Sequence, residues 1–137
     1  MVNVELWIPA RSPYVGVVRL ALSSLARTAG LGEEALDDLK IAVSEACANA
    51  VLAGDESSSP EPIGVFWTED DDRLIVEVAD PAGSKESLEA SETDTGGFSS
   101  RLAMSAALLE TLVDGCEIEA MEGGGVRTRL VVDRRRD

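Results

Sequence analysis

The sequence predicts an α/β two-layer sandwich, in which a mixed, mostly antiparallel sheet of about five strands is covered on one face by three helices. Two observations support this fold class. Short segments with apolar residues at every second position come mainly in pairs joined by turns, as in antiparallel hairpins. Three longer segments have apolar residues three or four positions apart, as in amphipathic helices. One layer of helices on one sheet would bury both sets of apolar side chains.

The first third of the chain predicts one strand and two helices. Residues 2–8 alternate between apolar and polar side chains, which is typical of a half-buried strand. A helix is then predicted, with Ser12 as its N-cap, a proline in its first turn and a stop at Gly30. The next helix begins after Gly32 and runs to about Ala53. Its first turns are acidic, as the helix dipole favours.

The rest of the chain predicts two hairpins, separated by a long loop and a third helix. A polar segment at 54–62 predicts a solvated loop. The elements that follow are strands at 63–68 and 74–79, a loop at 81–97, a helix at 98–113, and strands at 116–121 and 126–132. The loop at 81–97 is rich in Ser, Glu and Gly. A loop of this length in a compact domain is often a lid or a binding loop.

Composition excludes several functional classes. The 137 residues fit one domain, residues 1–137, and carry a net charge of −14, which disfavours direct contact with nucleic acid. The absence of histidine excludes histidine-dependent catalysis and zinc–histidine sites. Cys47 and Cys116 lie in apolar segments without a metal or disulfide spacing, so we expect small core residues in a reducing compartment. No signal peptide or spanning segment is recognisable, so we expect a cytoplasmic protein with no membrane partner.

The second predicted helix carries a polar pair in an apolar setting. Glu45 and Asn49 are one helical turn apart and lie roughly opposite the predicted core stripe. That stripe consists of Leu36, Leu39, Val43, Ala46 and Ala50. An unpaired carboxylate among apolar side chains is costly, and a hydrated Mg²⁺ would compensate it, since this ion prefers oxygen ligands. The alternative is an exposed helix face with two ordinary polar residues.

Three further positions have the chemistry of a nucleotide site. Asp80 ends a predicted strand and enters a turn that contains Gly83, where a carboxylate can accept hydrogen bonds from an amino-purine. Gly96 and Gly97 precede a predicted helix, whose free N–H groups favour phosphate. Arg101, one turn further on, could reach the same phosphate. The alternatives are a surface turn, a flexible hinge and a solvated arginine.

Taken in order, these features resemble the GHKL nucleotide-binding fold, also called the Bergerat fold. They are a Glu-xxx-Asn helix, a hairpin ending in Asp near Gly, a long loop and a helix that begins after Gly. The resemblance covers nearly the whole chain. The small size and the segment VSEACANAV are similar to one branch of this superfamily, the RsbW-like anti-sigma factor serine kinases. The lack of histidine argues against the histidine kinase branch.

The resemblance implies an anti-sigma regulatory factor with ATP-dependent serine-protein kinase activity toward an anti-sigma antagonist. In such a protein Glu45 would orient or deprotonate the attacking hydroxyl, and Asn49 would be a ligand of Mg²⁺ that bridges the phosphates of ATP. Asp80 would read the adenine amino group, and residues 81–97 would form the ATP lid. The implied partners are a sigma factor and an antagonist of the STAS type. A homodimer is also implied, formed through the first strand and helix, where Trp7 and residues 15–18 could be exposed.

The chain departs from the family pattern at two glycine-rich turns. Gly83 comes one place later than in the family's aspartate box, and Val126 stands where a threonine is common. Thr128 lies two positions further on, and we do not assign the role of that threonine to it. These departures leave an alternative function open, a non-catalytic sigma-binding module of the same fold with a degenerate nucleotide site.

Overall fold

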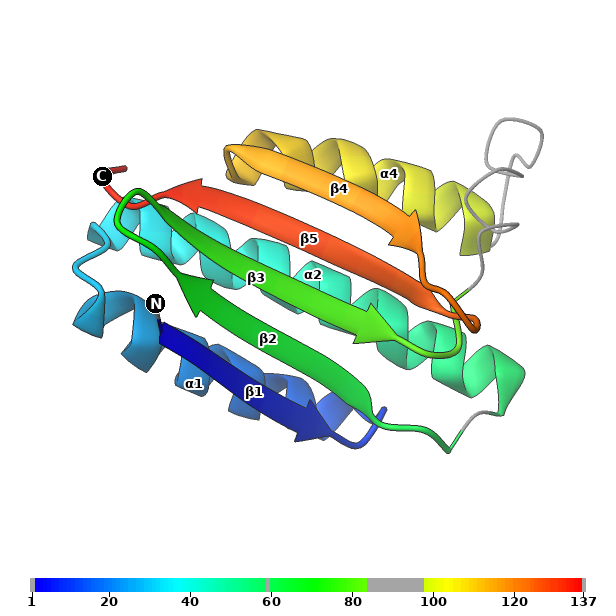
Figure 1. Cartoon of the computed structure of the whole chain (residues 1–137). Helices are drawn as coiled ribbons and strands as arrows, with labels where there is room; N and C mark the ends of the chain where they lie inside the picture. The colour runs from blue at the N-terminus through cyan, green and yellow to red at the C-terminus, as the bar shows by residue number, and fades with distance from the viewer. Residues whose placement is uncertain (1, 59, 84–97, 137) are drawn as a thin grey trace.

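The computed structural model describes residues 2–58, 60–83 and 98–136, and no side chains at 98–104. Figure 1 shows one layer of helices lying against one face of a twisted sheet. The elements are β1 (Val2–Ile8), a 3₁₀ turn (Ser12–Tyr14), α1 (Val15–Thr28), α2 (Glu33–Ser57), β2 (Ile63–Glu69), β3 (Arg73–Asp80), α4 (Phe98–Leu112), β4 (Gly115–Ala120) and β5 (Val126–Asp133). The predicted α/β sandwich with five strands and three helices is therefore confirmed.

The sheet has the strand order β1-β2-β3-β5-β4, and each of the four pairings is antiparallel. The predicted sheet was mixed and mostly antiparallel, whereas these five strands pair in antiparallel fashion throughout. In the pairing of β3 with β5, Asp80 lies opposite Val126 and Val78 lies opposite Thr128. Because side chains alternate between faces, these four residues share the face that α2 and α4 cover.

The core lies between the sheet and the helices. The five residues of the stripe predicted on α2 are each at most 5% exposed. Trp67 of β2 is also buried, and its indole Nε1 donates a hydrogen bond to Glu69 Oε2 at 2.8 Å. Cys47 is buried as predicted, and burial raises the pKa of its thiol to about 12. Cys116 is half-buried and packs against the core.

Two helix boundaries differ from the prediction. Ser12 does not cap α1, because residues Ser12–Tyr14 form a separate 3₁₀ turn before it. The second helix continues past Ala53, where the Ser57 hydroxyl donates to the Ala53 carbonyl at 2.8 Å, and it ends as Ser58 adopts a left-handed φ of 56°. The predicted loop therefore begins only after Ser57. None of the described helices combines the length and apolarity needed to cross a membrane.

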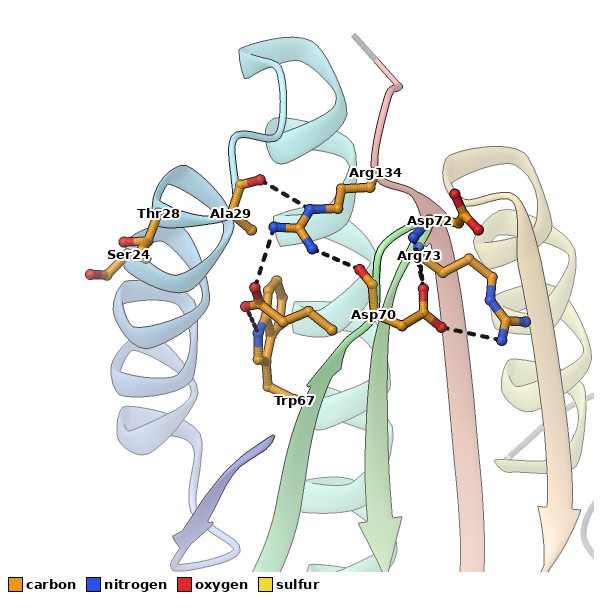
Figure 2. Close-up of polar contacts among 9 residues, drawn as sticks. Ser24, Thr28, Ala29, Trp67, Asp70, Asp72, Arg73 and Arg134 are labelled. Atoms are coloured by element: carbon orange, nitrogen blue, oxygen red, sulfur yellow. Dashed lines mark hydrogen bonds and ion pairs between the residues drawn. The ribbon is translucent and has the colours of Figure 1, made fainter. Parts of the chain in front are cut away.

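The residue that follows β5 ties the end of the chain to two other elements. Arg134 Nη1 donates to the Asp70 carbonyl at 2.7 Å, and Nε donates to the Ala29 carbonyl at 3.3 Å (Figure 2). Its Nη2 lies 3.5 Å from Glu69 Oε1. The other oxygen of the same carboxylate accepts the hydrogen bond from the Trp67 indole. One guanidinium therefore joins the end of α1, the β2–β3 turn and the C-terminal segment.

We expect Arg134→Ala to lower the free energy of unfolding by about 1–3 kcal/mol, because two backbone carbonyls would lose a charged donor. Urea denaturation with a constant m value measures this loss. Arg135→Ala is the matched control, since this side chain is 85% exposed and its one ion pair with a described residue is to exposed Asp72. Its effect should stay within about 0.5 kcal/mol. Equal losses in the two variants would contradict the role given to Arg134.

Candidate functional site

Three side chains from two helices form a hydrogen-bonded group, which we call the Glu45–Ser105–Asn49 network. Glu45 and Asn49 come from α2, and Ser105 comes from α4. The Ser105 hydroxyl donates to Glu45 Oε1, and Asn49 Nδ2 donates to Ser105 Oγ at 2.8 Å. Ser105 is only 3% exposed, whereas Glu45 and Asn49 are half-buried. The predicted polar pair is therefore covered by α4 in part, and the hydroxyl compensates the carboxylate.

Sequence reasoning missed Ser105. It is the one polar residue in the segment Leu-Ala-Met-Ser-Ala-Ala-Leu-Leu at 102–109, within a predicted helix. That pattern was a usable signal, because a lone serine among apolar residues of a packed helix needs a hydrogen-bond partner. The partner could not be identified from the sequence, since 60 and 56 positions separate Ser105 from Glu45 and Asn49.

Asp80 lies at the end of β3, as predicted, and is 9% exposed. Its Oδ1 accepts the backbone N–H groups of Ala82 at 3.0 Å and Gly83 at 3.1 Å. Loss of hydration raises the pKa of the Asp80 carboxyl to about 6, against the lowering effect of those two hydrogen bonds. A larger residue than glycine does not fit at position 83, since a Cβ there would lie 2.8 Å from Asp80 Oδ2 and 3.0 Å from Val126.

A small cavity brings Asn49 and Asp80 to one place. Its volume is about 20 Å³, which is close to the space of one water molecule. The lining residues are Ala46, Asn49, Val78, Asp80, Gly83, Leu109, Ile118, Val126 and Thr128. The cavity includes Thr128, which sequence reasoning set aside. The strand register explains its place, because Thr128 follows Val126 by two positions and so lies on the same face of β5.

Glu45 lines a second, larger space. A groove of about 870 Å³ lies between α1 and α2 and is lined by Ser12, Val15, Arg19, Asp37, Lys40, Ile41, Ser44, Glu45, Ala48, Val51, Leu52 and Asp55. Ile41 and Leu52 are 51% and 38% exposed, so the apolar residues that flank the polar pair in sequence are partly at the surface. The network thus has Glu45 at the groove and Asn49 at the small cavity, with Ser105 between them.

The remaining predicted residues cannot be placed in the site. Gly96 and Gly97, with most of the predicted lid, lie outside the described residues. Arg101 lies in the first half of α4, but its side chain is also outside the described part. The site is therefore built from α2, α4, β3 and β5.

The donor set can be tested for Mg²⁺. No group of three His, Cys, Asp or Glu side chains within 2–58, 60–83 and 98–136 could hold a metal. Mg²⁺ commonly takes only one or two protein ligands and completes its shell with waters and nucleotide phosphates. The carboxamide oxygen of Asn49, which takes no part in the bond that Nδ2 donates to Ser105, fits an ion that arrives with a nucleotide.

Comparisons with known proteins agree on one family. A family model described as "Histidine kinase-like ATPase domain" matches residues 8–132. "Serine-protein kinase RsbW" of Bacillus pumilus (strain SAFR-032) is 36% identical over 143 residues, which cover 97% of this chain and 88% of that protein. The protein of the same name from Bacillus subtilis (strain 168) is 33% identical over 128 residues, or 88% of this chain and 79% of the relative.

A solved structure agrees on the fold. "The crystal structure of the RsbU and RsbW domains of Rv1364c from Mycobacterium tuberculosis" matches with a TM-score of 0.71 at 20% identity. The match covers 96% of this chain but only 32% of that longer chain. At this identity the likeness supports the arrangement of helices and strands, and nothing finer.

Burial of Asp80 predicts a pH-dependent stability. The pKa of its carboxyl is raised in the folded state from 3.8 to about 6, so its contribution to stability is present at low pH and is lost as the pH rises through 6. We therefore expect Asp80→Asn to be more stable than the wild type at about pH 7.5, by on the order of 2 kcal/mol, and the difference to shrink toward about pH 4. Urea denaturation at the two pH values measures it. The exposed Asp71→Asn is the control, and a difference that does not change with pH would contradict this account.

Proposed function

Because the chain belongs to the histidine kinase-like ATPase family, and within it to the RsbW serine-protein kinases, we propose that it is an anti-sigma regulatory factor that phosphorylates a serine of an anti-sigma antagonist with ATP. The observation that carries this proposal is the Glu45–Ser105–Asn49 network beside the cavity of Asp80. The proposed general base and metal ligand, Glu45 and Asn49, come from α2, and the carboxylate proposed to read adenine, Asp80, comes from β3.

On the nucleotide side, we assign Asp80 to adenine and Asn49 to the metal ion. The two bonds that Asp80 accepts from Ala82 and Gly83 fix its carboxylate in place, and we assign it to the adenine amino group. Gly83 leaves the space beside Oδ2 free of a side chain. A cavity of about 20 Å³ cannot hold a purine, so we expect it to widen when nucleotide binds. Gly96, Gly97 and Arg101 remain our candidates for the phosphates, and 81–97 for the lid.

Asn49 would hold Mg²⁺ through its carboxamide oxygen, and the ion would neutralise charge on the phosphates. The attacking serine belongs to the partner, and we assign its entry to the groove between α1 and α2, which Glu45 lines. Glu45 would orient that hydroxyl and accept its proton as the phosphoryl group is transferred. Catalysis of this kind rests mainly on positioning and charge neutralisation.

The proposed partners follow from the same family. We propose a sigma factor and a STAS-type antagonist as binding partners, a cytoplasmic location, and a single domain that spans 1–137. A homodimer through β1 and α1 is also proposed, since Trp7 is 54% and Val17 is 47% exposed. Val18, expected to be part of that surface, is instead fully buried in the core and cannot contribute.

Nucleotide binding is the first test. We expect calorimetric titration to show ATP binding that Mg²⁺ strengthens, and Asn49→Ala to lose that strengthening because its metal ligand is gone. Asn3→Ala is the matched control, since Asn3 is exposed on β1. If the wild type binds no nucleotide at millimolar concentration, the enzymatic proposal is wrong, and a non-catalytic sigma-binding module becomes the better description.

Phosphoryl transfer is the second test. We expect Glu45→Gln, assayed at saturating Mg·ATP, to phosphorylate the antagonist about 10²–10⁴-fold more slowly, because the general base is lost. Glu34→Gln, at an exposed position on the same helix, should keep the wild-type rate. Transfer of radiolabel to the purified antagonist measures both rates. An unchanged rate in Glu45→Gln would show that Glu45 is not the general base.

A further inference from the structure

We propose that Ser105 is a positioning residue that decides which end of the Asn49 carboxamide faces the nucleotide side of the site. Its hydroxyl lies between the Glu45 carboxylate and Asn49, and it is almost fully buried. The consequence for metal binding rests on the function proposed above, whereas the positioning itself concerns only the side chains of this chain.

The number of available hydrogen-bond donors fixes the orientation of the Asn49 carboxamide. A carboxylate can only accept, and a serine hydroxyl has one proton to give. That proton goes to Glu45 Oε1, so Ser105 Oγ can only accept from Asn49. Asn49 must therefore turn its NH₂ group toward Ser105, which is the orientation in which Nδ2 lies 2.8 Å from Oγ. The Asn49 carboxamide oxygen is then turned away from Ser105 and is free to bind a metal ion.

The burial of Ser105 leaves the Asn49 carboxamide little freedom to adopt the other orientation. At 3% exposure, its hydroxyl has little access to water that could replace either partner. Without the hydroxyl, the two orientations of the carboxamide differ by a half turn of its terminal group, and the carboxylate no longer selects between them. Residues that orient a metal ligand in this way change metal affinity by about 10- to 100-fold when they are removed.

The composition of the chain makes a direct test possible. It has two side-chain carboxamides, Asn3 and Asn49, and no glutamine. An ¹H–¹⁵N correlation spectrum therefore contains two NH₂ pairs, and Asn49→Ala identifies the buried one. We expect Ser105→Ala to move the Asn49 pair toward the position of the exposed Asn3 pair, and to speed its hydrogen exchange by about tenfold or more.

Three comparison variants separate positioning from a general loss of structure. Ser105→Thr keeps the hydroxyl and should keep the Asn49 signals in place. Ser23→Ala removes another buried serine hydroxyl, which donates to the Arg19 carbonyl of its own helix, and should leave them unchanged. Glu45→Gln adds a third NH₂ pair and should disturb the Asn49 pair although Ser105 is kept, because a glutamine can also donate to the hydroxyl. This variant keeps the test valid if Ser105→Ala does not fold.

Calorimetry with ATP completes the experiment. We expect Ser105→Ala to reduce the Mg²⁺-dependent gain in nucleotide affinity about tenfold or more, with metal-free binding retained. Unchanged Asn49 signals in both Ser105→Ala and Glu45→Gln would overturn the positioning role. If the signals move while the wild type itself shows no Mg²⁺-dependent binding, the positioning role stands and the proposed function fails.

Discussion

The hydroxyl of Ser105 joins a carboxylate and a carboxamide that stand one turn apart on α2, and the chemistry that we propose for the site depends on this contact. Without it, Glu45 would face an apolar helix with its charge uncompensated, which is costly in a partly buried place. The contact also holds α4 against α2 at a defined point. Packing of apolar residues alone allows two helices to slide along each other, whereas a hydrogen bond between two buried or half-buried groups does not.

The second half of the site depends on strand register. Asp80 is the last residue of β3, and its neighbours on β5 are set by the antiparallel pairing that runs from Arg73 to Asp80. A shift of one position would turn Thr128 to the opposite face of the sheet. The pairing of β3 with β5, together with the packing of α2 on the sheet, thus brings a carboxylate, a carboxamide and a hydroxyl to one small cavity, although they come from segments far apart in sequence.

The fold could be predicted almost entirely from the sequence, because it follows from local periodicity. The strand of residues 2–8 and the stripe that includes Leu39 and Val43 are examples. Boundaries were less predictable: α2 continues through Gly54 and ends after Ser57, where Ser58 rather than a glycine adopts the left-handed backbone conformation. In the site, Glu45, Asn49 and Asp80 could be selected because each is polar where its neighbours are apolar. Ser105 and Thr128 could not be assigned, since their partners are set by tertiary contacts between α4 and α2 and between β5 and β3.

The last residues of the chain illustrate how little composition says about structural importance. The segment after β5 is short, highly charged and close to the terminus, which is usually the profile of a dispensable tail. Arg134 nevertheless holds the loop after α1 and the tip of the β2–β3 hairpin together. Removal of Arg134 would therefore loosen elements in the first quarter and in the middle of the chain. The outermost few residues consequently limit how far this domain can be trimmed for fusion or crystallisation.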